Sequence, residues 1–216
     1  MKNKSFLFCI LASCLAFGEF EILDPSVYKI NINGVESSFN DVGNLLLEDL
    51  FHRTSFGSLD GIGLIDALKM NIKIDGFCEV GSPVWYVEYG MFGRTNTKAI
   101  ALVNPETKVI KYIKGAWIEP AVIDSSIEYS IATYADAKSL VWNELNKKTG
   151  QNVNESDQLE VSQFFKLNFE IENFCKTGDP VWCVETLFNN TKITALVNPK
   201  SKSIAFVRAP WLKLED

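Results

Sequence analysis

Histidine is nearly absent from this sequence: the 216 residues contain a single one, His52. Most zinc sites and much side-chain acid–base catalysis depend on histidine, so its scarcity argues against both. No Cys-x-x-Cys pair offers alternative zinc ligands. We therefore expect no metal site, no cofactor and no catalytic constellation, and we do not expect the chain to be an enzyme.

An excess of positive charge is also missing. Lysine and arginine total 21 and aspartate and glutamate total 27, for a net charge of −6. Proteins that coat nucleic acid need excess cations to displace counterions, so that class of partner is not expected. The acidity favours a basic protein partner instead, because opposite charges steer association. Hydrophobic residues make up 47% and aromatic residues 12%, which excludes a disordered chain.

Long hydrophobic runs are limited to residues 5–17, which are too few for a bilayer span of about 20 residues. Lys2 and Lys4 precede this run, and Ala16 and Gly18 place small side chains after it. This pattern predicts a secretory signal peptide over residues 1–18 and a periplasmic or secreted protein. Loss of the two lysines would change the net charge from −6 to −8.

Two other fates of this segment fit the sequence. Residues 11–14, Leu-Ala-Ser-Cys, resemble a bacterial lipobox, in which Cys14 would be lipidated and the signal would end before it. The product would then be a membrane-anchored lipoprotein. The third alternative is that the segment is retained and Cys14 is simply one of its apolar residues.

The remainder of the chain contains an internal sequence repeat. PVWYVE at 83–88 recurs as PVWCVE at 180–185, and ALVNP at 101–105 recurs at 195–199. Between residues 68–88 and 165–185, 11 of 21 positions are identical. The sequence therefore predicts two tandem repeats, 25–119 and 120–216, that pack together.

Each repeat begins with a predicted helix. Ser38 with Asp41, and Thr133 with Asp136, have the spacing of a capping box, and Gly150 suits a C-terminal cap. The apolar residues that follow recur at helical spacing on one face. These are Phe39, Val42, Leu46 and Leu50 in the first repeat and Tyr134, Ala137, Val141 and Leu145 in the second.

Strands follow each helix. Residues 68–75 and 165–172 alternate between apolar and polar, which predicts strands that are wet on one side. The W-x-V segments and the two strands joined at Asn-Pro in ALVNPETKVI and ALVNPKSKSI supply the rest. A fifth strand is possible at 27–32 and 126–131. We expect an α+β fold in which each helix packs on a curved antiparallel sheet of about four strands. Glu88 and Glu185 should then point into water.

This order of elements resembles several known modules. A helix, a W-x-V strand and a strand that ends at Asn104 or Asn198 before the last strand resemble PepSY-like and cystatin-like modules. They also resemble the NTF2-fold immunity proteins of bacterial toxin systems. These resemblances span both repeats and imply binding, inhibition or toxin neutralisation outside the cytoplasm rather than catalysis.

Three cysteines follow the predicted signal: Cys78, Cys175 and Cys183. Cys175 and Cys183 flank the turn at 178–180, so they could meet across a hairpin within disulfide reach. Export to an oxidising compartment would favour that bond. Two alternatives remain open at this point, a Cys78–Cys175 bond and three thiols.

Trp117 and Trp211 end the two repeats beyond the last predicted strands. There they could form a partner surface or pack against the sister repeat. Taken together, the sequence predicts an exported, non-enzymatic binding protein, most simply an inhibitor or immunity-type protein. The alternatives are an exported hydrolase-like enzyme with a cleft between the repeats and a structural envelope protein.

Overall fold

The computed structural model describes residues 29–32, 35–53, 62–91, 97–123, 129–131, 133–151 and 163–214. The predicted signal peptide at 1–18, its alternative lipidation site Cys14 and the fifth-strand residues 126–128 lie outside these residues. The described elements follow one another in the order β1 (Lys29–Ile32), β2 (Val35–Ser38), α1 (Phe39–Arg53), β3 (Ile62–Lys69), β4 (Pro83–Met91), β5 (Thr97–Val103), β6 (Ile110–Lys114), α2 (Tyr134–Thr149), β7 (Gln163–Lys166), β8 (Pro180–Phe188), β9 (Thr191–Val197), β10 (Ile204–Arg208) and the 3-10 helix η1 (Pro210–Leu212).

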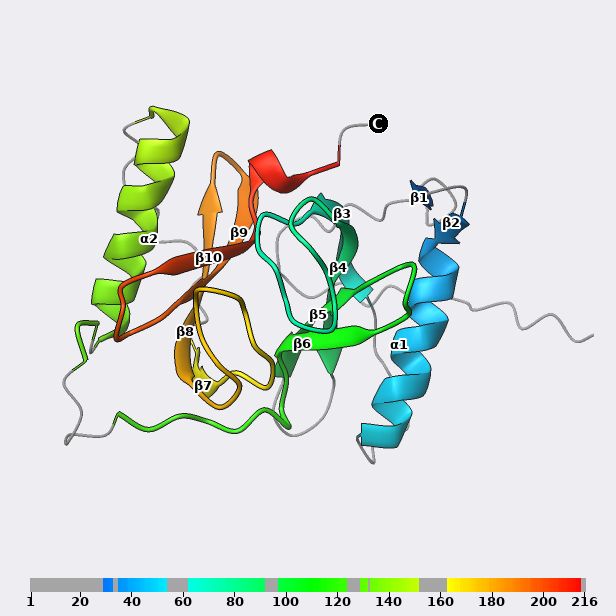
Figure 1. Cartoon of the computed structure of the whole chain (residues 1–216), viewed down its shortest axis with the longest axis horizontal. Coiled ribbons are helices and arrows are strands. Elements are labelled where there is room, and N and C mark those ends of the chain that lie inside the picture. The colour runs from blue at the N-terminus through cyan, green and yellow to red at the C-terminus, as the bar shows by residue number, and fades with distance from the viewer. Residues whose placement is uncertain are drawn as a thin grey trace, which may run out of the picture.

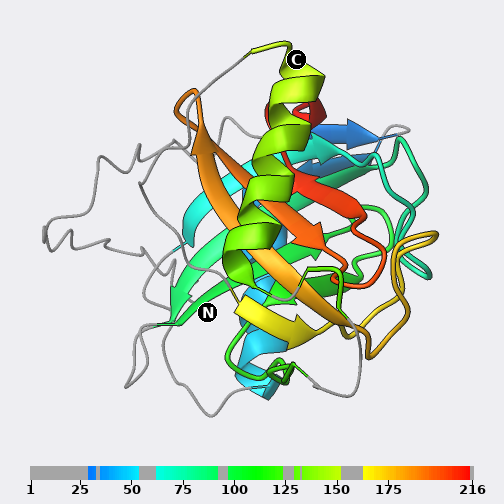
Figure 2. The same ribbon diagram turned by 90° about the vertical axis from the view of Figure 1, so that its left-hand side faces the viewer.

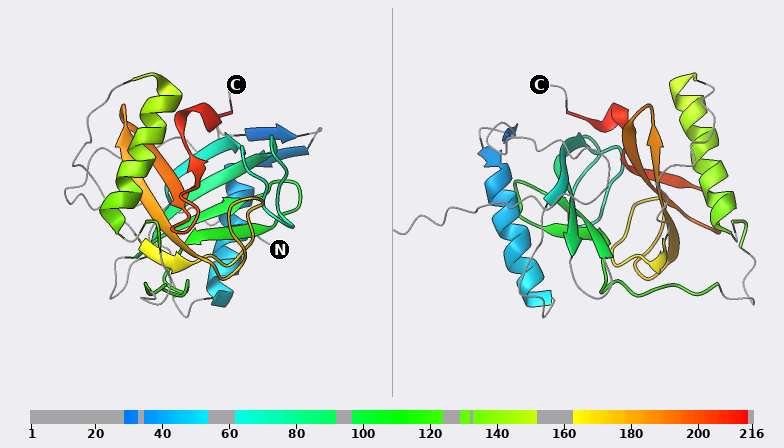
Figure 3. Two further views of the ribbon diagram at one scale, coloured as in Figure 1. Left: turned by 60° about the vertical axis from the view of Figure 1, so that its left-hand side comes forward. Right: turned by 180° about the vertical axis from the view of Figure 1, so that it is seen from behind.

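The fold is α+β, as predicted, with two antiparallel four-stranded sheets. The first sheet has the order β3-β4-β5-β6 and the second the order β7-β8-β9-β10. The two sheets stack between the two helices, so the layers run α1, first sheet, second sheet, α2 (Figure 1; Figure 3, right). Seen from the side in Figure 2, α2 lies across the outer face of the second sheet. This layering is consistent with a two-unit arrangement.

The predicted helix caps are confirmed for α2. The Thr133 hydroxyl accepts a hydrogen bond from the backbone N–H of Asp136 at 3.2 Å. At the other end, Gly150 adopts φ 66° and its N–H donates to the Asn146 carbonyl at 2.9 Å. Both contacts satisfy backbone groups that a helix end leaves without partners, which explains why the helix occupies this span.

The apolar stripe of each helix packs against its sheet. Val42, Leu46 and Leu50 are buried in α1, and Ala137, Val141 and Leu145 are buried in α2. Tyr134 contacts Trp182 of β8 with ring centroids 6.2 Å apart. Burying such side chains is worth roughly 1.5–3 kcal/mol each for the larger ones, which is the main reason the helices dock here.

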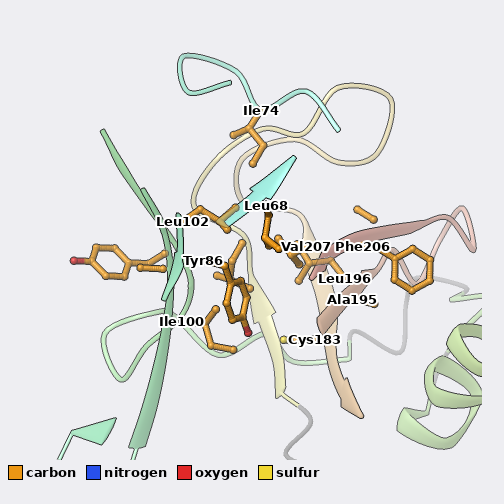
Figure 4. Packing of buried hydrophobic residues seen from close by; sticks show 14 of the residues in the cluster. Leu68, Ile74, Tyr86, Ile100, Leu102, Cys183, Ala195, Leu196, Phe206 and Val207 are labelled. Carbon is orange, nitrogen blue, oxygen red and sulfur yellow. The ribbon is translucent and has the colours of Figure 1, made fainter. Parts of the chain in front are cut away.

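The other face of each sheet was predicted to be wet, and this is wrong. The two sheets pack face to face and share one core, as Figure 4 shows for Tyr86, Leu102 and Leu196. Leu68 and Val207 point into the same layer (Figure 4). A sheet with one face on a helix and the other on a second sheet has no face left for water.

The predicted strands at 68–75 and 165–172 are only partly correct. β3 ends at Lys69 and β7 ends at Lys166. Beyond these points the chain forms compact loops, closed by N–H donation from Cys78 to the Ile74 carbonyl and from Cys175 to the Ile171 carbonyl, both at 3.1 Å. The alternating pattern arose because every second side chain of the loop also turns inward.

The predicted fifth strand is not part of either large sheet. β1 pairs with β2 in a separate two-stranded sheet. Residues 129–131, at the end of the second candidate strand, form no strand. Each large sheet therefore has four strands.

Backbone hydrogen bonds join the two sheets at two kinds of place. The loops meet at Ile74 and Ile171, where the N–H of Asp75 donates to Glu170 and the N–H of Glu172 donates to Lys73. The segment after β6 lies along β7, with Pro120 opposite Phe165. The segment after β10 lies along β3, where the N–H of Leu214 donates to Ala67. Each half of the chain thus lies along the first strand of the other half's four-stranded sheet, which is β3 or β7.

An asparagine organises the turn before the last strand of each sheet. The Asn104 side-chain oxygen accepts from the N–H groups of Glu106 and Thr107, and its amide donates to the Phe77 carbonyl. Asn198 makes the same three kinds of contact. This turn explains why the chain carries Asn-Pro before the last strand of each sheet, at 104–105 and at 198–199.

We predict that Asn104→Ala lowers the free energy of unfolding by about 2–3 kcal/mol, because it leaves the carbonyl of the buried Phe77 and two backbone N–H groups of the turn without their side-chain partner. Chemical denaturation measures the change. Asn71→Ala, at an exposed position, is the matched control and should change stability by less than about 0.5 kcal/mol. Equal effects of the two substitutions would contradict the role given to Asn104.

Candidate functional site

Six charged side chains gather between the two sheets and are named here the inter-sheet charge cluster. All but Lys192 are buried, and Lys192 is partly exposed. Three are acids and three are cations, and a fourth cation, the half-exposed Lys213, lies 3.8 Å from Asp66 at the edge of the cluster. Its members are Asp66, Glu88, Lys114, Glu185, Lys192 and Arg208.

β-Bulges aim two of the cations into this layer. In β6 the register with β5 shifts between Tyr112 and Lys114, and in β10 the register with β9 shifts between Phe206 and Arg208. In a regular strand, residues two apart share a face, but a bulge inserts one residue and turns the chain. Lys114 and Arg208 therefore enter the inter-sheet layer while Tyr112 and Phe206 lie on the helix side.

Lys192 links the carboxylates of the two sheets. Its ammonium lies 2.6 Å from Glu88 and 2.6 Å from Glu185. Lys114 is a second cation on Glu185: its ammonium donates to Glu185 Oε1 at 2.6 Å. Both side chains are at most 5% exposed. Burial lowers the pKa of Lys192, but the two carboxylates outweigh it and raise the pKa above its ordinary value.

Neutral hydroxyls extend the cluster. Tyr86 donates to Glu88 Oε1 at 2.6 Å and lies 2.8 Å from the Thr194 hydroxyl of the other sheet. Burial and the neighbouring Glu88 and Glu185 carboxylates raise the pKa of Tyr86 well above its ordinary value, so its proton is retained. Arg208 pairs with Asp66 across the sheets and lies over the Tyr86 ring.

The expectation that Glu88 and Glu185 point into water is therefore wrong. Both residues alternate with tryptophan-bearing positions, as predicted, but the face they occupy is covered by the second sheet. Each carboxylate is held by a cation, and the space around the cluster is filled by core side chains. This arrangement positions the two sheets, and its polar atoms are occupied with one another.

Sequence reasoning missed this cluster because it had no signal for the bulges. Lys114 and Arg208 stand at corresponding places in KGAW and RAPW, and that shared cation before the last tryptophan was the available hint. Because nothing in the sequence indicated that the two sheets pack face to face, Lys114 and Arg208 could only be interpreted as surface charges.

The three cysteines among the described residues are free and buried, so the predicted Cys175–Cys183 disulfide is not formed. Its premise was a hairpin that places the two residues opposite each other. In the structure Cys183 lies opposite Gln163, while Cys175 belongs to the tight turn that starts at Ile171. Burial raises the pKa of Cys78 to about 11 and of Cys183 to about 12, so these thiols are unreactive at neutral pH.

The two tryptophans proposed as a partner surface occupy separate, similar corners. The first corner comprises Arg53, Tyr112 and Trp117, and the second corner comprises Lys148, Phe206 and Trp211. In each, the tryptophan meets the strand aromatic edge-on, at 4.9 Å and 5.1 Å between ring centroids. A cation from the helix end lies over an aromatic ring of the corner.

The corners do not form one surface. The segment that follows β6 runs along the bottom of Figure 1, whereas η1 lies at the top. Trp117 is half-buried, and its indole nitrogen is buried with no hydrogen-bond partner. Trp211 is 38% exposed, and Lys148 Nζ lies 5.9 Å from the centre of its ring.

A second surface feature lies where the two loops meet. A shallow depression there is lined by Lys73, Asp75, Glu170 and Glu172. Lys73 is partly exposed and makes ion pairs with Glu79 at 3.2 Å and Glu172 at 3.8 Å. Among the described residues, no group of three or more histidine, cysteine or acidic side chains is arranged to hold a metal ion. No helix in that part of the chain is long and apolar enough to cross a membrane.

No family model, curated protein or solved structure matches this chain.

We predict that Glu185→Leu lowers the free energy of unfolding by about 3–5 kcal/mol, because it leaves the buried Lys114 ammonium without the carboxylate it faces. Lys114→Met combined with Glu185→Leu should recover much of the loss. Denaturant titration of both variants measures the effect. As a control, Glu119→Leu removes the exposed partner of Lys166 and should cost less than about 1 kcal/mol. No recovery in the double variant would contradict a direct interaction across the sheets.

Alkaline pH should destabilise the fold through its buried thiols. The unfolded Cys183 thiol loses its proton near 9.0, but the folded thiol keeps it to about 12. The unfolded state therefore binds fewer protons, and stability falls as pH rises through this window, by up to about 1.4 kcal/mol per pH unit per thiol. Urea titrations between pH 8 and 10.5 should show a shallower decline for Cys183→Ala than for the wild type. An identical slope would show that the thiol is accessible in the folded state.

Proposed function

We propose that this chain is an exported, non-enzymatic protein that acts by binding another protein, as an inhibitor or immunity-type protein does. The observation that carries the proposal is Trp211, a large aromatic side chain that is exposed yet held in place. Phe206 and Lys148 fix its ring, so a partner would meet a prearranged surface. Tryptophan is enriched among the residues that dominate binding energy.

The placement of the chemically versatile side chains supports binding over catalysis. The most concentrated titratable groups of the described chain, the inter-sheet charge cluster, are engaged with one another rather than directed at a surface. Side-chain catalysis requires such groups to reach a substrate. The alternative of a hydrolase-like enzyme would need a site elsewhere in the chain.

The proposal includes the internal duplication. Two units, 25–119 and 120–216, explain the shared strand order, the bulge before Lys114 and before Arg208, and the left-handed backbone at Lys108 (φ 61°) and Lys202 (φ 59°). The inferred PepSY-like, cystatin-like or NTF2-like origin of the unit stays a prediction, as does cleavage of residues 1–18. Packing two units together buries more apolar surface than one unit of this size manages alone.

Binding is tested with a purified partner. Immobilised wild-type chain is used to isolate a candidate from the extracellular or envelope fraction, and the candidate is then produced separately for calorimetry. Trp211→Ala should raise the Kd about 30-fold, equivalent to a loss of about 2 kcal/mol, because a fixed aromatic anchor is removed. With a basic partner, the association rate should also fall as salt rises.

Val80→Ala is the matched control for this measurement. Val80 is an exposed apolar side chain at 66%, in the loop between β3 and β4. Its substitution should leave the Kd unchanged within about threefold. Equal Kd values for the Trp211 and Val80 variants would contradict the proposed anchor, and turnover of a substrate by the purified chain would overturn the binding function itself.

A further inference from the structure

The two corners correspond in sequence and contacts, yet they expose their tryptophans differently. Gly115-Ala116-Trp117-Ile118 in the first corner matches Ala209-Pro210-Trp211-Leu212 in the second. The turns are closed in the same way, by N–H donation from Ile118 to Gly115 at 3.1 Å and from Leu212 to Ala209 at 3.0 Å. Because this turn hydrogen bond is shared, the side chains of the two corners are one source of the difference in exposure.

Glycine at position 115 makes room for the indole ring. A Cβ atom built on Gly115 would lie 2.8 Å from Cζ2 of Trp117, 2.9 Å from Cε2 and 3.0 Å from Cη2. Real Cβ atoms do not approach ring carbons this closely, and the ring is rigid, so it would have to move. At the corresponding position, Ala209 is buried and carries that Cβ atom.

We propose that Gly115 and Ala209 are positioning residues that decide which corner presents its tryptophan. Gly115 lets Trp117 fold inward onto the sheet, and Ala209 holds Trp211 outward. The chain therefore offers one tryptophan anchor rather than two equivalent ones. This inference deepens the proposed function and rests on it for its biological meaning, but the positioning itself is a property of the isolated protein.

The orphaned indole nitrogen of Trp117 fits this assignment. It is buried without a hydrogen-bond partner, whereas an exposed indole N–H can donate to water. The inward position therefore carries a desolvation cost that close packing against Gly115 must offset. Moving the ring outward would return that N–H to water, so we expect Gly115→Ala to remain folded.

The test labels the tryptophans with 5-fluorotryptophan and measures the solvent exposure of each by its ¹⁹F relaxation with a dissolved paramagnetic agent. Single tryptophan-to-phenylalanine variants assign the signals. Gly115→Ala should raise the exposure of Trp117 toward the value for Trp211. Ala209→Gly should lower the exposure of Trp211.

Two controls isolate the added Cβ atom. Gly90→Ala makes the same chemical change where a Cβ would meet nothing within 4 Å, so no tryptophan signal should respond. Ala116→Pro copies a second difference between the two turns and should leave Trp117 where it is. A response to Ala116→Pro alone would assign the difference to the proline and overturn the inference.

The outcomes separate this inference from the proposed function. If Gly115→Ala and Ala209→Gly leave both exposures unchanged, the positioning roles are wrong, whatever Trp211 binds. If the exposures change as expected and Ala209→Gly weakens partner binding in the direction of Trp211→Ala, both claims stand. If the exposures change while Trp211→Ala binds the purified partner as the wild type does, the positioning stands and the proposed anchor fails.

Discussion

The ion pairs between Glu185, Lys114 and Lys192 are the constraint on which the rest of the structure depends. Burying charge is expensive unless each ion meets a partner of opposite sign at hydrogen-bond distance. Here the partners come from both sheets: Lys114 from the first, Glu185 and Lys192 from the second. A shift of one sheet along the other would leave buried charges without their partners, so the cluster fixes how the two sheets meet. The apolar core around the cluster supplies most of the stabilisation.

Local structural features could be predicted from the sequence, but the packing of distant segments could not. The capping of α2 by Thr133 and Gly150, the helix stripes and the α+β class followed from spacing alone. The burial of Glu88 could not be predicted in this way, because alternation along a strand defines two faces but does not indicate what covers each face. The same limit applied to Cys175, whose partner was judged from a turn rather than from strand register. Bulges before Lys114 and Arg208 have no clear sequence signature, and they create the cluster.

The candidate site, too, could be predicted from the sequence only in part. Sequence reasoning selected Trp117 and Trp211 because both lie beyond the last strand, and the structure places them in similar corners at opposite edges. It separates them by exposure. A Cβ atom at position 115 would collide with the Trp117 ring, and this collision is the basis for assigning the difference to Gly115 and Ala209. Under the proposed function, the two corners would therefore present different surfaces to a partner.

Because the buried ion pairs join the two sheets, both sheets and the inter-sheet charge cluster should unfold as one cooperative unit. Native-state hydrogen exchange in increasing denaturant tests it most directly, since amides that open together share one free energy of opening. The account predicts that the most protected amides of β4 and β5 and those of β8 and β9 converge on a single global value. Two distinct values, with one sheet opening while the other stays protected, would contradict it.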